Sequence, residues 1–170
     1  MKTPAPADSL VCIPAFNEER RLPETLRELV PLLPPGCDLV VIDDGSRDDT
    51  RGAASRAGVE CLSLPIHLGY GGALQTGYKL ALARGYSHLI QMDADGQHAP
   101  ESLSLLLEPL RAGAADFVIG YRFHPGCDYS SPFLREVGRR FFAGICRLLS
   151  GFNLKDPTSG FKGFNRTTLK

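Results

Sequence analysis

The fold of this 170-residue chain is decided by the stretch Leu39-Val40-Val41-Ile42, which runs directly into Asp43-Asp44-Gly45-Ser46-Arg47-Asp48-Asp49-Thr50. Four consecutive apolar residues without polar alternation predict a strand that is buried on both faces. Ser46 and Asp49, three positions apart, predict a capping box for a helix that extends to Ala57. The unit is therefore a strand, an acidic turn and a helix.

The same unit recurs along the chain. Apolar runs predict further strands at residues 10–13, 59–64, 88–92 and 116–119, and helical periodicity predicts helices at 19–33, 72–84, 100–111 and 132–149. Apolar strands separated by helices are typical of right-handed β-α-β units. The predicted fold class is α/β, a three-layer αβα sandwich with a mostly parallel central sheet. Residues 156–162 are expected to form a loop.

Length and composition narrow the class of protein. The length suits one globular domain, expected at residues 10–170 after a leader at residues 1–9. Nineteen basic residues balance nineteen acidic ones, so no net charge would draw the chain to nucleic acid or anionic lipid. No run of about 18 apolar residues occurs, which predicts neither a membrane span nor a signal peptide. Five cysteines without a Cys-x-x-Cys pair are expected to be reduced thiols, which indicates a cytoplasmic protein.

Polar clusters follow the predicted strands, at residues 14–18, 43–44, 67–72 and 93–97. Ligands of parallel sheets bind beyond the carboxyl ends of the strands, near the point where strand order reverses. Asp93 and Asp95 stand two residues apart, so in extended backbone their carboxylates point the same way. Such a pair favours Mg²⁺ or Mn²⁺, which keep water ligands and recruit substrate phosphates. The alternative is that both residues cap the next helix or solvate a loop.

The remaining candidate residues have two interpretations each. Asp43 and Asp44 could accept hydrogen bonds from a base or a ribose, or could only shape a turn. Arg122, Arg135 and Arg139 could hold phosphates, or could belong to a solvated helix face. Asp156 could act as a base or orient Lys162, or could be a turn residue before Pro157. The glycine-rich segment 67–77 matches neither a dinucleotide fingerprint nor a phosphate loop, and could serve helix packing as well as ligand contact.

Six motifs in order make the chain resemble family 2 glycosyltransferases, most closely the polyprenyl-phosphate sugar transferases of dolichol-phosphate mannose synthase type. The resemblance implies a GT-A fold, a nucleotide-diphosphate sugar donor, a divalent metal, inversion at the anomeric carbon and a polyprenyl phosphate acceptor. The motifs are Val11-Cys-Ile-Pro14-Ala-Phe16-Asn17-Glu18, Asp43-Asp44-Gly45-Ser46-x-Asp48-x-Thr50, Leu68-Gly69-x-x-x-Ala73-x-x-x-Gly77, Asp93-Ala94-Asp95-x-Gln97, Gly120-x-Arg122 and Asp156-x-Thr-Ser-Gly160-Phe-Lys162.

Carried over by position, the resemblance implies a nucleoside pocket, a metal–diphosphate centre at Asp93, Asp95 and Gln97, and catalytic roles for Asp95, Arg122 and Asp156. The donor-binding positions are Pro14, Phe16, Asn17, Glu18, Asp43, Asp44, Gly69, Ala73 and Ala94, with Arg135 and Arg139 on phosphate. Family members usually carry Arg where Lys162 stands, and usually continue for some 60 or more residues beyond this point. We therefore expect the usual C-terminal portion, with its part in acceptor recognition and membrane attachment, to be missing.

The resemblance also implies a cellular location and leaves a second function open. A polyprenyl phosphate acceptor places the protein in the cytoplasm, at the cytoplasmic face of the membrane, with membrane contact only peripheral or through a partner. No nucleic-acid partner is expected. The alternative function is a catalytically inactive sugar-nucleotide-binding fragment or regulatory partner. A sugar-1-phosphate nucleotidyltransferase would need a basic, glycine-rich loop after the first strand, which residues 14–18 do not supply.

Overall fold

A six-stranded sheet with the order β3-β2-β1-β4-β6-β5 forms the centre of the computed structural model, which describes residues 7–94, 102–120, 148, 156 and 159–169. Strands β1 to β4 run parallel, whereas β6 is antiparallel to both β4 and β5. The fold is thus the predicted α/β class with a mostly parallel sheet. The strands are β1 (Ser9–Ala15), β2 (Cys37–Asp43), β3 (Glu60–Ser63), β4 (His88–Gln91), β5 (Phe117–Ile119) and β6 (Lys162–Asn165).

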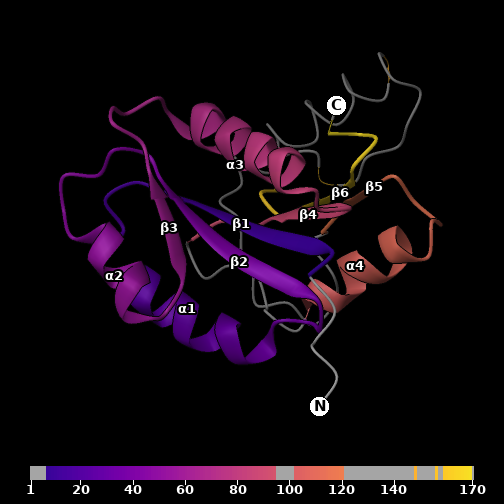
Figure 1. The fold of residues 1–170 in the computed structure, drawn as a ribbon, viewed down its shortest axis with the longest axis horizontal. Coiled ribbons are helices and arrows are strands. Elements are labelled where there is room, and N and C mark those ends of the chain that lie inside the picture. Colours follow the sequence, from indigo (N-terminus) through magenta and orange to yellow (C-terminus); the bar gives the residue numbers. More distant parts are fainter. Residues whose placement is uncertain (1–6, 95–101, 121–147, 149–155, 157–158, 170) are drawn as a thin grey trace.

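Helices cover both faces of the sheet (Figure 1). One face packs against α3, and the other packs against α1, α2 and α4. Side chains of β1 alternate between the two cores: Val11 and Ile13 face α1 and α2, whereas Leu10 and Cys12 face α3. The helices are α1 (Leu22–Leu29), a 3₁₀ turn η1 (Val30–Leu32), α2 (Thr50–Arg56), α3 (Tyr70–Arg84) and α4 (Leu103–Arg111). None of these described helices is long and apolar enough to cross a membrane.

Strand order reverses between β1 and β4. From β1 the chain passes to β2 and β3 on one side of the sheet, and then returns to β4 on the other side of β1. The carboxyl ends of β1 and β4 therefore flank the position where ligands of such sheets bind. Pro14 to Glu18 follow β1 there, and Asp93 follows β4 by two residues.

Two local predictions are wrong. Lys162, predicted as the last residue of the loop 156–162, instead begins β6, a strand for which we made no prediction; its backbone pairs with both β4 and β5 although the segment contains no apolar run. The capping box is also absent: the N-cap residue Asp49 makes no side-chain cap bond, and Ser46 Oγ instead accepts the Asn17 N–H at 2.9 Å. The predicted helix at residues 132–149 lies outside the described residues, apart from residue 148.

Candidate functional site

Hydrogen bonds join the loop after β1 to the acidic turn after β2. The Asn17 side chain accepts the Arg47 N–H at 2.9 Å, and Thr50 Oγ1 accepts the Glu18 N–H at 2.9 Å. Asn17 has a φ of 56°, a left-handed conformation that asparagine tolerates better than most residues. The sequence places small polar side chains at these positions, and they satisfy the backbone donors of the neighbouring loop.

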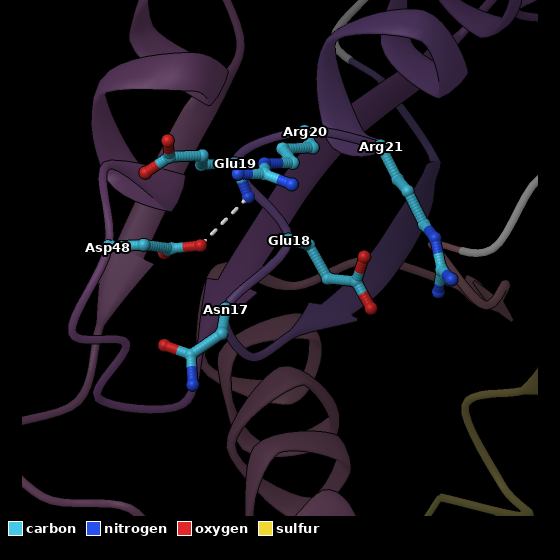
Figure 2. Close-up of a pocket in the computed structure, with 6 residues that line it drawn as sticks. All are labelled: Asn17, Glu18, Glu19, Arg20, Arg21 and Asp48. Atoms are coloured by element: carbon cyan, nitrogen blue, oxygen red, sulfur yellow. Dashed lines mark hydrogen bonds between the residues drawn. The ribbon is translucent and has the colours of Figure 1, made fainter.

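An open cavity of about 490 Å³ borders this junction, lined by Asn17, Glu18, Glu19, Arg20, Arg21 and Asp48 (Figure 2). Glu19 and Asp48 lie together on one side of this cavity, where the Glu19 N–H donates to Asp48 Oδ2 at 3.1 Å. Figure 2 shows the side chains of Glu18 and Arg21 extending on the side away from Asp48. Glu18 also lines the next cavity, so the two spaces adjoin at this residue.

The second cavity, of about 320 Å³, lies where the strand order reverses. Its walls come from the ends of β1, β2 and β4 and from the first turns of α3. It brings together sequence-predicted residues from four separate motifs. The lining residues are Pro14, Ala15, Phe16, Glu18, Asp44, His67, Tyr70, Ala73, Asp93 and Ala94.

Asp44 is held by the segment before α3. The residue is only 2% exposed, and its Oδ1 accepts the Leu68 N–H at 2.8 Å. His67 Nδ1 lies 2.8 Å from Oδ2, which is an ion pair when the imidazole is protonated. The His67 ring stacks on Phe16 with centroids 3.9 Å apart and planes 27° apart. A carboxylate beside an aromatic pair is suited to a planar, hydrogen-bonding ligand.

Asp43 and Asp44 have different environments although they are adjacent. Asp43 Oδ1 accepts the Ser46 N–H at 3.0 Å and closes the acidic turn. Gly45 within that turn has a φ of 69°, and a Cβ there would lie 2.8 Å from the backbone carbon of Ile66. Asp44 lines the cavity, and Asp43 is not one of the residues that line it. The predicted contact of Asp43 with a nucleoside stays a prediction.

Asp93 is contacted from two sides. Its Oδ1 accepts the hydroxyl of Tyr70 at 2.7 Å. The other oxygen lies against Gly160, where any Cβ would overlap the carboxylate. Burial, together with the hydrogen bond to Asp93 and the charge of that carboxylate, raises the pKa of Tyr70. The phenol therefore remains a hydrogen-bond donor at neutral pH.

Other predicted residues are placed with less detail or fall outside the described part. Gly69, with a φ of 84°, is the N-cap residue of α3, and Ala73 follows one turn later. Asp156 is buried at 2% exposure, and its carbonyl accepts the Ser159 N–H at 3.2 Å. The other predicted site residues, Asp95, Gln97, Arg122, Arg135 and Arg139, lie outside the described residues.

Sequence reasoning missed His67 and Tyr70 as individual site residues. Both stand in the glycine-rich segment 67–77, which we interpreted as a turn followed by a tightly packed helix. The packing is real, since a Cβ on Gly77 would overlap Cys12 Sγ. Two aromatic rings in a segment of small residues, next to a strand end, are the signal that could have identified them.

The donor chemistry of the cavity fits a hard divalent cation. Three carboxylates line it, those of Glu18, Asp44 and Asp93. Carboxylate oxygen is the ligand type that Mg²⁺ and Mn²⁺ prefer, and a site with few protein ligands leaves positions for water and phosphate. Within residues 7–94, 102–120, 148, 156 and 159–169, no group of three or more His, Cys, Asp or Glu side chains is placed so that it could hold a metal ion, so these three carboxylates do not form a metal site by themselves. Asp93 is the described member of the predicted ligand set.

Solved structures share this fold. Glucosyl-3-phosphoglycerate synthase from Mycobacterium tuberculosis in complex with UDP matches with a TM-score of 0.72 and 26% identity, over 95% of this chain and 57% of that one. A complex of the same enzyme with Mn²⁺, UDP-glucose and phosphoglyceric acid matches with a TM-score of 0.73, 26% identity and the same coverage. The fold is GT-A-like.

Two relatives found by sequence have a higher sequence identity to this chain than these solved structures have. Undecaprenyl-phosphate mannosyltransferase of Micrococcus luteus is 39% identical over 168 residues, which are 95% of this chain and 68% of the relative. Polyprenol monophosphomannose synthase of Mycolicibacterium smegmatis is 36% identical over 95% of this chain and 63% of its own length. This chain thus spans about two thirds of these relatives. The family model for glycosyl transferase family 2 matches residues 10–170, and this chain belongs to that family.

Proposed function

We propose that this chain carries the donor-binding site of an inverting glycosyltransferase that moves a sugar from a nucleotide-diphosphate sugar to a polyprenyl phosphate. The observation that carries the proposal is the cavity at the strand-order reversal, where Asp44 and Asp93 from two different strand ends line one space beside Phe16 and His67. The 26% identical neighbour with Mn²⁺ and UDP-glucose, and the relatives named for polyprenyl phosphates, support the donor and acceptor classes.

Within the cavity, we assign the nucleoside to the Phe16–His67 pair and Asp44. The stacked rings present an aromatic surface, and the Asp44 carboxylate can accept hydrogen bonds from a base or a ribose. The diphosphate is assigned to the Asp93 side of the cavity. The Asp44 to Asp93 direction therefore corresponds to the nucleoside-to-sugar direction of the donor.

Asp93, together with Asp95 and Gln97, would hold Mg²⁺ or Mn²⁺. When bound, such a cation stabilises the negative charge that develops on the departing diphosphate, by several kcal/mol. The role that we assign to Asp93 is to fix the position of the cation. Asp95, Gln97 and their ligand roles are proposals from the resemblance.

The chemistry of the acceptor suggests roles for the remaining candidate residues. A phosphate monoester has a second pKa of about 6, so it is mostly dianionic at neutral pH and needs cations more than a general base. We assign Arg122, Arg135 and Arg139 to the acceptor and donor phosphates on this ground. Asp156, buried before β6, is assigned the orientation of Lys162 or the part of a base. Because the proposed acceptor is a lipid phosphate, we assign the protein to the cytoplasmic face of the membrane.

The proposal is tested by thermal-shift measurements with UDP, GDP and other nucleoside diphosphates, each with and without Mn²⁺. A ligand that binds only the folded state at 100 times its Kd raises the stability by about 2.7 kcal/mol. We expect at least one nucleoside diphosphate with Mn²⁺ to raise Tm, and Asp93→Asn to abolish the Mn²⁺-dependent part. Glu108→Gln, an exposed residue on α4, is the matched control and should retain the full shift.

Two results would count against the proposal. No shift with any nucleoside diphosphate would contradict a donor site. A shift without release of nucleoside diphosphate, when the matching sugar donor and a polyprenyl phosphate are supplied together, would favour a binding module over a transferase.

A further inference from the structure

We propose that Tyr70 is a positioning residue for Asp93, and that Gln91 and Tyr78 hold Tyr70 in place for this task. The inference rests on the proposed function, in which Asp93 is a ligand of the cation that accompanies the donor diphosphate. It adds three residues of this chain whose part is to fix the carboxylate before the cation arrives.

The three side chains form one hydrogen-bonded series that ends on the carboxylate. Tyr78 Oη donates to Gln91 Oε1 at 2.5 Å, and Gln91 Nε2 donates to Tyr70 Oη at 3.0 Å. Tyr70 Oη in turn donates to Asp93 Oδ1 at 2.7 Å. Every donor in the series points toward Asp93, so the hydroxyl hydrogen of Tyr70 is directed at the carboxylate and not at solvent.

Gln91 occupies a place where an apolar side chain would be expected. It ends β4 in the middle of the sheet, paired with Cys12 on one side and Lys162 on the other, and is 2% exposed. Leu89, two residues earlier on the same face, packs in the apolar core beside α3. A buried amide is costly unless both of its ends are hydrogen-bonded. The two tyrosines satisfy Gln91, and Gln91 thereby fixes the Tyr70 hydroxyl.

The series suits a metal ligand. An ionised carboxylate has about four lone-pair directions, and the Tyr70 bond uses one of them. The charge-assisted bond to Oδ1 and the close approach of Gly160 to the other oxygen restrict the carboxylate to one orientation. Partners of this kind behind a metal ligand are worth about 10- to 100-fold in metal affinity or activity.

The test is Mn²⁺ binding, measured by EPR of free Mn²⁺ in titrations with UDP and, separately, with GDP present. We expect Tyr70→Phe to raise the Mn²⁺ Kd about 10-fold, and Tyr78→Phe to raise it less, because Tyr78 acts through two further hydrogen bonds. Tyr86→Phe is the matched control: the Tyr86 hydroxyl donates to Asp38 Oδ2 at 2.5 Å, and neither residue lines the described cavities. This control removes the same type of bond and should leave the Kd unchanged.

A second variant separates positioning from stability. Gln91→Met combined with Tyr78→Phe replaces a buried polar pair by apolar groups of similar size, which is expected to be nearly neutral for folding. The Tyr70 hydroxyl loses its support in this variant, so we expect weaker Mn²⁺ binding at an unchanged Tm.

The outcomes distinguish the two proposals. Normal Mn²⁺ binding by Tyr70→Phe and by the double variant would overturn the positioning inference alone. Tighter binding by Tyr70→Phe would also overturn it, because the hydroxyl would then compete with the cation. Failure of the unmodified protein to bind Mn²⁺ with either nucleotide would overturn the inference together with the metal assignment on which it rests.

Discussion

The Asp93 carboxylate and the Gly160 backbone approach each other so closely that no larger residue fits at position 160. Asp93 follows β4, whereas Gly160 precedes β6, so the contact joins two segments that are distant in sequence. On the other side, the Tyr70 hydroxyl occupies Oδ1. The position of the Asp93 carboxylate therefore depends both on the missing side chain of Gly160 and on the hydroxyl of Tyr70.

Gly160→Ala is predicted to displace the Asp93 carboxylate. We expect a loss of about 1–3 kcal/mol in the free energy of unfolding, as for other overpacked sites, together with weaker binding of Mn²⁺ and nucleoside diphosphate. Urea denaturation and the thermal-shift assay measure the two effects. Gly71→Ala is the control, because a Cβ at Gly71 meets nothing within 4 Å. Equal behaviour of the two variants would contradict the close contact at Gly160.

Helix α3 connects the site to the rest of the fold. Its first residue, Tyr70, contacts Asp93, and its last residue, Arg84, forms a two-pronged ion pair with Glu60 of β3 at 2.6 and 2.5 Å. Arg166, beyond β6, donates to the carbonyls of Leu82 and Tyr86 at 3.0 Å. The end of α3 away from the site is thus attached to two segments, which supports the orientation of its first turn.

The Glu60–Arg84 pair predicts a pH dependence of stability. The hydrogen bonds from Arg84 lower the pKa of Glu60 below its usual 4.5, so the pair stabilises the folded state above that pH and ceases to do so as pH falls through the lowered value. Because the side chains are 40% and 47% exposed, solvent screening limits the effect to about 1 kcal/mol or less.

Urea denaturation at about pH 7, 5 and 4 tests this prediction by comparing the free energy of unfolding of the unmodified protein with that of Glu60→Gln. We expect the difference in unfolding free energy to be largest at neutral pH and to shrink at the acidic end. Glu28→Gln, at an exposed position of α1, serves as the control. A difference that grew on acidification would contradict the predicted sign.

At the scale of the whole molecule, β6 joins the C-terminal part of the chain to the parallel sheet. It pairs with β4 through Gly163 opposite Ile90 and with β5 through Gly163 opposite Val118. A Cβ on Gly163 would lie 2.8 Å from Leu110 Cδ1 of α4. Residues from both ends of the described chain thus share one sheet and its cores.

Gly163→Val is therefore predicted to lower the stability of the entire domain. We expect a loss of about 1–3 kcal/mol from overpacking against α4, with an unchanged m value in urea. Hydrogen exchange should show reduced protection in β1 and β2 as well as in β5 and β6. Thr167→Val, at an exposed position, is the control. Loss of protection confined to β5 and β6 would show that this part unfolds separately.

The sequence alone was sufficient to predict the α/β class, the first five strands, the helices between them and the edge of the sheet where the site lies. These features depend on apolar runs and periodicity, which are local properties of the chain. Adjacent residues of one motif nevertheless have different parts: Asp43 closes a turn, whereas Asp44 lines the cavity.

Only the tertiary structure decided the place of β6 and the surroundings of Asp93. The segment Lys162–Asn165 becomes a strand because β4 and β5 supply hydrogen-bonding partners on both sides, which no local propensity encodes. Tyr70 and Gly160 contact Asp93, and Gln91 contacts Tyr70, because α3, β4 and the segment before β6 converge at one sheet edge. Contacts between segments so distant in sequence arise only when the sheet brings the strand ends together.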